Sequence, residues 1–332
     1  MTVRGCGAVE VVRWSALPSF GQETCYVCGG SCRKDVRFAT YTYWKCADCF
    51  TSQVLPQPSS EDLRSYYDRY HQSEQVGGVY DEVEDRMKAD FPTKVGLALT
   101  YAGTKHSRLL DVGCGKGFFV KAALDEKIRA EGIDLSRSGI EYAVNTLGVK
   151  ATTGRIQDQQ NESWKGSFDV VTLWATVEHL PDPLSVLQAI HGCLKPGGIL
   201  LCDTGLGHSP WEQLLPGHSQ WYDAPQHLFV FSENGLVRLL EACGFSIVHV
   251  DTNFERSFVR RWVRWIRHFL LCFMGWICLG PFLGKHGLRS MRQQAKWPLG
   301  RLLSIVAKKK SAQVDERIVS ASEVKSDSKC PT

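Results

Sequence analysis

Four cysteines near the N-terminus stand in two CxxC pairs, formed by Cys25 with Cys28 and by Cys46 with Cys49, and 17 residues separate the pairs. Two such pairs at this spacing are typical of a Cys₄ zinc site, in which each pair supplies two thiolates to a tetrahedron. Because protein ligands would fill all four positions, the zinc would be structural. A redox-active pair is the alternative, but it requires only one CxxC within a βαβ unit. We expect nearby Cys32, which is outside the spacing, to be a spare thiol.

A glycine-rich loop is the second feature with chemical content. The apolar residues of Leu109–Val112 predict a strand that runs into Gly113, Gly115 and Gly117, and a helical pattern follows. Glycines at such a turn allow positive φ and a close approach of backbone to a ligand, and the helix start offers free N–H groups. A plain tight turn is the alternative. The dinucleotide fingerprint GxGxxG is not matched, because Phe118 stands where its third glycine would be.

An acid precedes the loop, so that the stretch from Asp111 reads acid-x-Gly-x-Gly-x-Gly. It resembles motif I of class I S-adenosylmethionine-dependent methyltransferases. Their cofactor carries a sulfonium and an ammonium instead of a pyrophosphate, and an acid at the strand end suits such a cation. Asp134 ends a second predicted strand, 23 residues after Asp111, where a carboxylate can accept hydrogen bonds from two ribose hydroxyls. The alternative role for Asp134 is to cap the next helix, which Ser136 could do instead.

The resemblance continues through SFDVVTLWATVEHLPDP at 167–183, then LKPGGILLCDT and HLFVFSENGLVRLLEACGF, and covers about 104–254 plus a strand at 302–307. It implies a Rossmann-like, doubly wound α/β fold with a seven-stranded, mostly parallel sheet that binds S-adenosyl-L-methionine. The residues it assigns to the cofactor are Asp111, Gly113, Cys114, Gly115, Gly117, Asp134, Leu135, Asp158 and Trp174. Asp158 is included because Arg155 stands where family members carry the acid that meets the adenine amine, and a guanidinium cannot accept that hydrogen bond. Asp158 or a nearby backbone carbonyl would have to take its place.

Three titratable residues, Glu178, His179 and His227, are predicted to lie at the carboxyl ends of the strands. Methyl transfer needs an oriented nucleophile, and a hydroxyl nucleophile also needs a base that removes its proton. These residues are therefore the candidate catalytic groups; structural hydrogen bonding is the alternative for the histidines, and ordering of the cofactor pocket for Glu178. Some methyltransferases of RNA ends and quinones bind a metal through the corresponding Glu-His and further acids. No acid stands near Trp174 or Ala175 to complete such a set, so a catalytic metal is not expected.

The elements that must position these residues belong to a chain of 332 residues, 43% of them apolar, which excludes a wholly disordered or collagen-like protein. Thirteen cysteines, an odd number, and an N-terminus without a signal-like apolar stretch favour reduced thiols in a cytoplasmic protein. We expect an N-terminal segment with a zinc ribbon (1–55), a helical linker or lid (56–103), a methyltransferase domain (104–310) and a disordered tail (311–332).

Charge is distributed unevenly along the chain. From Glu255 to Lys310 there are 13 Lys and Arg and one acid, so this segment carries +12 and leaves −8 for the rest of the +4 chain. Arginines and tryptophans recur at helical spacing from residue 256 and lead into 16 uncharged residues that end at 284, too few for a comfortable membrane span. We interpret 255–300 as a helical insertion between the last two strands, with 256–284 in peripheral contact with the cytosolic face of a membrane. A helical cap packed on the core and a nucleic-acid contact are the alternatives.

Together these features predict an S-adenosylmethionine-dependent methyltransferase for a small-molecule or glycan acceptor, which could be lipid-linked. The ribbon followed by this core resembles a bacterial group of zinc-ribbon methyltransferases, many of which belong to cell-surface glycan or secondary-metabolite pathways. Two alternatives stay open: an RNA methyltransferase with the ribbon and the basic segment as clamps, and a non-catalytic adaptor with a degenerate methyltransferase fold. The ribbon is only weakly basic, which argues against a nucleic-acid partner. The acceptor, the methylated atom (O, N or C) and the oligomeric state are left open.

Overall fold

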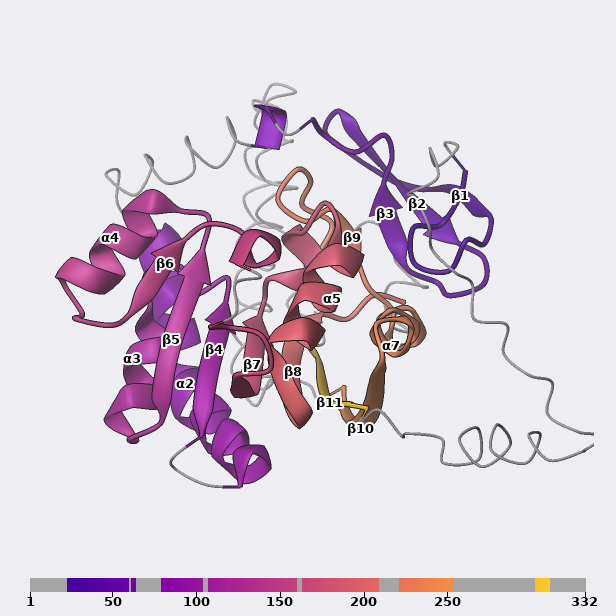
Figure 1. Ribbon diagram of the computed structural model, residues 1–332. Coiled ribbons are helices and arrows are strands. Elements are labelled where there is room, and N and C mark those ends of the chain that lie inside the picture. The colour runs from indigo at the N-terminus through magenta and orange to yellow at the C-terminus, as the bar shows by residue number, and fades with distance from the viewer. Residues whose placement is uncertain are drawn as a thin grey trace, which may run out of the picture.

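The part of the chain that the computed structural model describes contains two β-sheets and the helices that cover the larger one (Figure 1). The described residues are 23–59, 61–63, 79–103, 107–159, 163–208, 221–252 and 302–310, and for 79–89 only the backbone is described. The predicted insertion (255–300) and the predicted disordered tail (311–332) lie outside these ranges.

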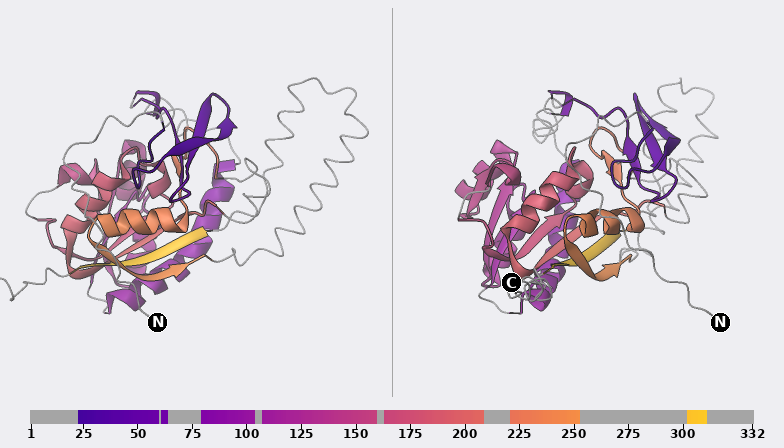
Figure 2. Two further views of the ribbon diagram at one scale, coloured as in Figure 1. Left: turned by 90° about the vertical axis from the view of Figure 1, so that its right-hand side faces the viewer. Right: turned by 45° about the vertical axis from the view of Figure 1, so that its right-hand side comes forward.

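The larger sheet has seven strands in the order β10-β11-β8-β7-β4-β5-β6. In chain order they are β4 (Arg108–Val112), β5 (Arg129–Asp134), β6 (Ala151–Thr153), β7 (Phe168–Trp174), β8 (Leu194–Gly205), β10 (Phe245–Asp251) and β11 (Leu302–Lys309). The strands from β4 to β8 run parallel, and β11 is antiparallel to both of its neighbours. The mostly parallel α/β sheet is therefore confirmed. The predicted late strand is confirmed too, as β11 beside β10 (Figure 2).

Helices cover both faces of this sheet, because successive residues of a strand point to opposite sides. Leu109 of β4 packs into one apolar cluster with residues of α2, α3 and α4, whereas its neighbour Leu110 packs into a second cluster with residues of α5 and α7. The helices are α2 (Val79–Ala102), α3 (Phe118–Asp125), α4 (Arg137–Asn145), α5 (Pro183–Cys193) and α7 (Glu233–Ala242). The strands between these helix layers are buried on both faces. Ligands can therefore reach the sheet only at the ends of its strands.

Serine caps fix where two of the helices begin. The Ser232 hydroxyl accepts a hydrogen bond from Gly235 N at 2.9 Å, which confirms its predicted role at the start of α7. The Ser136 hydroxyl does the same for Gly139 N at 3.1 Å at the start of α4. Each cap satisfies a backbone donor that the first helical turn leaves unpaired. Because Ser136 is the cap of α4, the carboxylate of Asp134 is left for other partners.

The smaller sheet joins the cysteine-rich segment to the core of the protein. Its strands, in the order β1-β2-β3-β9, are β1 (Cys32–Phe38), β2 (Tyr41–Cys46), β3 (Ser52–Val54) and β9 (Phe229–Val230). The last of these comes from the segment between β8 and α7, and it pairs antiparallel with β3, Ser52 opposite Val230. The cysteine-rich segment that carries β1, β2 and β3, called the ribbon below, therefore shares one sheet with the segment that precedes α7.

Helix α2 belongs to the core although its sequence lies in the predicted linker, 56–103. Phe91, Val95 and Ala98 on this helix are buried in the cluster that contains Phe119 of α3. The same helix makes contacts with β7 and β8. It thereby brings the side chains of its middle turns to the two strands that end at the predicted site.

Candidate active site

The three glycines after β4 all adopt positive φ: 78° at Gly113, 51° at Gly115 and 78° at Gly117. Other residues would be strained in this conformation, and an added Cβ at Gly113 would also lie 2.5 Å from Thr176 Oγ1. At Gly115 an added Cβ would meet no heavy atom within 4 Å. The loop therefore presents bare backbone at the carboxyl end of the sheet, as the sequence predicted.

Asp134, at the end of β5, connects this loop to the next helix. One carboxylate oxygen accepts a hydrogen bond from Gly115 N at 2.9 Å, and the other accepts one from Ser136 N at 2.7 Å. Leu135, the next residue, is 66% exposed. A carboxylate with an exposed leucine beside it offers acceptors to hydroxyl groups and apolar surface to a flat ring.

Asp111 is a buried acid under the loop. Its Oδ1 accepts a hydrogen bond of 2.7 Å from the hydroxyl of Thr172 on neighbouring β7. Burial raises the pKa of Asp111 to about 7, whereas Thr172 and the charge of Lys94 act in the opposite direction. The charges of Asp134 and Asp203 also favour the protonated form. An acid that titrates near neutral pH will respond to a cation bound beside it.

A buried ion pair that the sequence did not reveal lies at the end of β7. Lys94 Nζ is 2.8 Å from Asp203 Oδ2, with side chains 17% and 6% exposed, and it also lies 4.6 Å from the centre of the Trp174 ring. The other oxygen of Asp203 accepts a hydrogen bond of 2.7 Å from Ala175 N. Among the described residues, Trp174 Nε1 is a buried donor with no acceptor. A bound ligand could supply that acceptor.

Two of the residues assigned to the cofactor, Cys114 and Asp158, do not present their side chains at the glycine loop. Cys114 turns its thiol inward, since a Cβ added to Gly132 would lie 2.5 Å from Cys114 Sγ, so this residue offers a ligand only its backbone. Asp158 is exposed in the 3₁₀ turn η2 (Ile156–Gln159), which follows β6. The assignments of Cys114 and Asp158 to the cofactor stay predictions.

The three candidate catalytic residues come together in space. Glu178 and His179 lie in the 3₁₀ turn η3 (Val177–His179) just after β7, and His227 comes from the loop before β9. The three can each offer one ligand atom, and these atoms lie within 4.8 Å of one another. Glu178 is 3% exposed, and burial raises its pKa above the usual range, while His179 acts in the opposite direction. The sequence predicted all three residues at the carboxyl ends of the strands, and the structure brings them within ligand distance of one another.

Backbone carbonyls hold both imidazoles. His179 Nδ1 lies 2.7 Å from the carbonyl oxygen of Gln226, and His227 Nδ1 lies 2.9 Å from that of Trp221. A carbonyl oxygen can only accept, so Nδ1 carries the proton in each ring. The lone pair of each neutral imidazole is therefore on Nε2.

The ribbon supports this cluster through the backbone just before β9. Tyr43 donates its hydroxyl hydrogen to the carbonyl oxygen of His227 at 2.6 Å. Leu228 N donates to the Glu178 carbonyl at 2.8 Å, and the Leu228 carbonyl accepts from Val54 N at 2.9 Å. The positions of His227 and Glu178 thus depend on strands of the cysteine-rich sheet.

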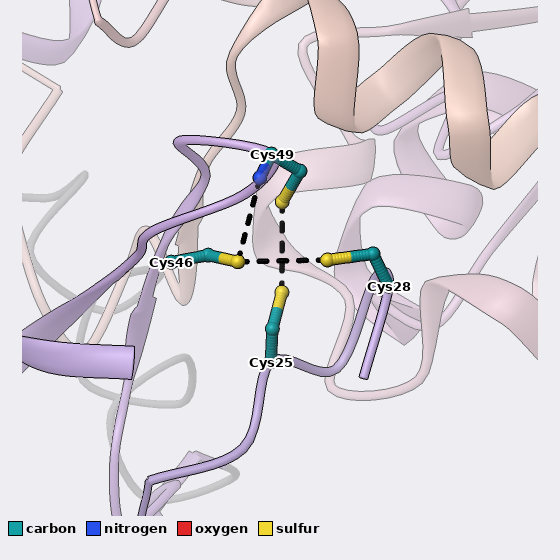
Figure 3. A group of neighbouring side chains, drawn as sticks. All are labelled: Cys25, Cys28, Cys46 and Cys49. Atoms are coloured by element: carbon teal, nitrogen blue, oxygen red, sulfur yellow. Dashed lines mark hydrogen bonds between the residues drawn. The ribbon is translucent and has the colours of Figure 1, made fainter. Parts of the chain in front are cut away.

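The four predicted zinc ligands point at one centre (Figure 3). Their sulfur atoms lie within 4.8 Å of one another, with 3.6 Å between Cys25 and Cys49 and 3.5 Å between Cys28 and Cys46. Backbone N–H groups of residues 48 and 49 lie 3.4 and 3.5 Å from Cys46 Sγ, as expected around a thiolate. Four sulfurs in this arrangement fit a tetrahedral Zn²⁺ ion. Zinc itself stays a proposal.

Comparison with protein families identifies the larger unit. The family model described as "Methyltransferase domain" matches residues 84–250, half of the chain. The chain belongs to this family. The match begins in α2 and ends in β10, so it includes the glycine loop, the buried ion pair and the Glu178 cluster of this methyltransferase domain. The cysteine quartet lies outside the matched residues.

Curated relatives of the domain include ubiquinone biosynthesis O-methyltransferases. The protein of this name from Pseudomonas aeruginosa (strain UCBPP-PA14) is 35% identical over 117 residues, which are 34% of this chain and 50% of that protein. The one from Histophilus somni (strain 2336) is 32% identical over 165 residues, 43% of this chain and 69% of that protein. The chain thus spans about half the length of the first of these relatives.

Solved structures also resemble the chain. A SAM-dependent methyltransferase from Archaeoglobus fulgidus is 17% identical with a TM-score of 0.45, covering 73% of this chain and 99% of that one. The Burkholderia thailandensis 1,6-didemethyltoxoflavin-N1-methyltransferase, solved with 1,6-didemethyltoxoflavin and S-adenosylhomocysteine, is 15% identical with a TM-score of 0.48, covering 84% and 99%. The assignment of the fold rests on the strand order described above.

Membrane contact was predicted for 256–284, which the described part of the chain does not include. Within that part, no helix has both the length and the apolar character needed to cross a membrane. Peripheral contact of the insertion stays a prediction.

Proposed function

We propose that this protein is an S-adenosylmethionine-dependent methyltransferase that methylates an oxygen atom of a small-molecule or glycan acceptor. One observation carries the proposal: the glycine loop with Asp134 and the cluster of Glu178, His179 and His227 lie at the same edge of the sheet. The loop follows β4 and the cluster follows β7, and these strands are hydrogen-bonded neighbours. Ligands of open α/β sheets bind at this carboxyl edge.

The residues of the loop fit the cofactor by their chemistry. Asp134 offers a carboxylate to ribose hydroxyls, Leu135 offers apolar surface to an adenine ring, and Asp111 offers negative charge to the cationic methionine part. When bound, the cofactor supplies a methyl group on a sulfonium, whose departure needs no protonation. The work left to the chain is to orient the acceptor oxygen and to accept its proton.

The histidines fit the role of base. With Nδ1 bonded to a carbonyl, each imidazole directs its basic Nε2 elsewhere, and the ring is held in one tautomer. The carboxylate of Glu178 next to them would stabilise the imidazolium that forms when a proton is accepted. Methylation at oxygen is favoured because the two curated relatives described above are named O-methyltransferases.

The position of the insertion favours an amphiphilic, lipid-linked acceptor. Asp251 near the start of the insertion pairs with Ser304 just after its end, and Ser304 pairs with Asp203 of β8. Asp203 in turn binds Ala175, at the end of β7. The basic, tryptophan-rich segment therefore leaves and rejoins the sheet beside the proposed acceptor site, where it could bring a membrane-bound acceptor to the protein.

Calorimetry with S-adenosylmethionine tests the cofactor. We expect wild type to bind and Asp134→Ala to bind about 10–100-fold more weakly, since charge-assisted hydrogen bonds contribute about 1.5–3 kcal/mol. Asp125→Ala, which removes an exposed carboxylate of α3, is the matched control and should bind as wild type does. Absence of S-adenosylmethionine binding by the wild-type protein would contradict the proposal.

Transfer of a labelled methyl group to a bacterial lysate tests the acceptor class. Label in the organic phase after solvent extraction supports a lipid-linked acceptor, and label in the small aqueous fraction supports a soluble one. Label that disappears after ribonuclease treatment would replace the proposal by the RNA alternative. No labelled product, in spite of cofactor binding, would favour the non-catalytic adaptor.

A further inference from the structure

The cluster of Glu178, His179 and His227 has the composition of a metal site. Its members are two imidazoles and one carboxylate, and their ligand atoms lie within 4.8 Å of one another. Two histidines with one carboxylate, and open positions on the other side, are a donor set that catalytic zinc and non-haem iron sites use. A first-row ion sits about 2.1 Å from such atoms, so small side-chain adjustments would close this set around one ion.

The two histidines are held as metal-binding histidines usually are. In such sites the ring nitrogen that does not bind the ion donates its hydrogen to a carbonyl or carboxylate, which fixes the tautomer. Here Nδ1 of His179 donates to the Gln226 carbonyl and Nδ1 of His227 donates to the Trp221 carbonyl. In both rings Nε2 is thereby left as the nitrogen that bears the lone pair, the form that a metal ion requires.

Glu178 supplies an independent observation. This side chain is 3% exposed, and its Oε2 is a buried oxygen with no hydrogen-bond partner among the described residues. A carboxylate oxygen that is removed from water and left without a donor is costly. A cation held between Glu178 and the imidazoles would remove this cost.

The third ligand, His227, comes from the segment just before β9, the strand that pairs with β3. The sequence offers no acid near Trp174 or Ala175, so the third ligand is a residue far along the chain from Glu178 and His179. The Leu228 N–H bonded to the Glu178 carbonyl at 2.8 Å joins the two segments directly. The set is therefore assembled by tertiary structure.

We propose that Glu178, His179 and His227 form a binding site for one divalent transition-metal ion, separate from the cysteine quartet. Imidazole nitrogens favour Zn²⁺, Fe²⁺ or Co²⁺ over Mg²⁺, which prefers oxygen ligands. The role of the ion rests on the proposed function: it would bind a hydroxyl of the acceptor and lower its pKa, so that the proton passes to water. In the metal-bound state the ion would thus take the place of the imidazole base, because both Nε2 atoms would be ligands. Binding of the ion itself does not depend on that function.

Zinc content tests the site. The full-length protein is incubated with excess Zn²⁺, passed through a desalting column and analysed for zinc per chain. We expect Glu178→Gln and His227→Ala each to hold about one equivalent less than wild type, and the quartet to keep its own ion. His249→Ala, which removes an exposed histidine of β10, is the matched control and should keep the wild-type content. Equal zinc content in wild type, Glu178→Gln and His227→Ala would overturn the proposal.

Cobalt distinguishes the two sites by their ligands. Co²⁺ bound to the quartet gives intense thiolate charge-transfer absorption, whereas Co²⁺ bound to nitrogen and oxygen gives only weaker ligand-field bands. We expect Glu178→Gln to lose the second set of bands and to keep the first. Loss of both sets of bands would mean that Glu178→Gln disturbs the ribbon. In that case His227→Ala, in which His179 is intact, must lose the nitrogen–oxygen bands and keep the thiolate bands. If His227→Ala does not show this selective loss, the proposal fails. Calorimetry with S-adenosylmethionine on the same samples reports separately on the proposed function.

Discussion

The hydroxyl of Tyr43, in the ribbon, donates a 2.6 Å hydrogen bond to the backbone carbonyl of His227, in the methyltransferase domain. The same hydroxyl accepts a hydrogen bond from Asp223 N at 3.1 Å, and the Tyr43 side chain is fully buried. One phenol thus holds both sides of the turn that carries His227. The ribbon contributes to the geometry of the proposed acceptor site and not only to the stability of the N-terminus.

Tyr43→Phe should therefore impair methyl transfer more than cofactor binding. The substitution removes the hydroxyl that binds both the His227 carbonyl and Asp223 N, and a hydrogen bond of this kind contributes about 0.5–1.5 kcal/mol. We expect about a tenfold loss of kcat, from a mispositioned imidazole, with an unchanged Kd for S-adenosylmethionine. The measurements are steady-state kinetics and calorimetry, and Tyr41→Phe in the same strand is the control. A variant with normal kcat would show that this bond does not position His227.

Loss of the proposed zinc site should also disturb the position of His227. Cys49→Ser removes one ligand of the quartet, and the Cys49 carbonyl also accepts a hydrogen bond from the Ser232 hydroxyl at the start of α7. Without the ion, we expect the ribbon to unfold and β9 to lose its partner β3. Methyl transfer should then fall to background, whereas cofactor binding at β4 and β5 should persist. Cys32→Ser, outside the quartet, should keep its zinc and its activity; a Cys49→Ser protein with full activity would contradict the link.

The titration of Asp111 predicts how stability depends on pH. The pKa of this acid is raised to about 7 in the folded protein from 3.8, mainly by burial, although Lys94 opposes the shift and Asp134 and Asp203 add to it. Between these two values the folded state binds the proton that the unfolded state has released, so the free energy of unfolding falls as pH rises through this range. Urea unfolding at several pH values measures the slope. Asp111→Asn should make it flatter, and an unchanged slope would contradict the assignment.

The same acid predicts how cofactor binding depends on pH. A cationic ligand favours the ionised carboxyl, so S-adenosylmethionine should release a proton from Asp111 when it binds near pH 7 and should bind more tightly above that pH. Calorimetry in two buffers with different ionisation enthalpies counts the protons released. Asp111→Asn is the control for protons released by the amino group of the ligand itself. Equal proton release by wild type and variant would rule out a direct charge contact.

Local patterns were enough to predict the large sheet. The β-branched run of β7, the glycine loop and the cap at Ser232 are each encoded in a few adjacent residues, and the structure confirms them. Even β11, beyond a long insertion, was predictable because LLSIVA is apolar and β-prone. Such elements depend mainly on neighbouring side chains.

The features that escaped the sequence depend on distant pairing. Strand β9 has two residues, too few for any periodic pattern, and it exists because β3 pairs with it. The ion pair of Lys94 with Asp203 joins a helix and a strand that are far apart in the chain. The approach of His227 to Glu178 and His179 has the same origin. The sequence predicted all three residues at the carboxyl ends of the strands, but it did not show that His227, far along the chain, comes within ligand distance of the other two.

The ion pair of Lys94 and Asp203 leads to a last prediction about stability. Removing one partner of a buried pair leaves an uncompensated charge and costs about 3–5 kcal/mol, so Lys94→Met should strongly lower the free energy of unfolding. The double variant Lys94→Met/Asp203→Asn should recover part of that loss, because a neutral amide needs no counter-charge and its carbonyl oxygen can still accept from Ala175 N. Lys121→Met, which breaks an exposed pair on α3, should cost about 0–1 kcal/mol. Urea unfolding measures all three. A double variant no more stable than Lys94→Met would show that the stability is lost with the cation–π contact between the Lys94 ammonium group and the Trp174 ring, whose centre lies 4.6 Å from Nζ.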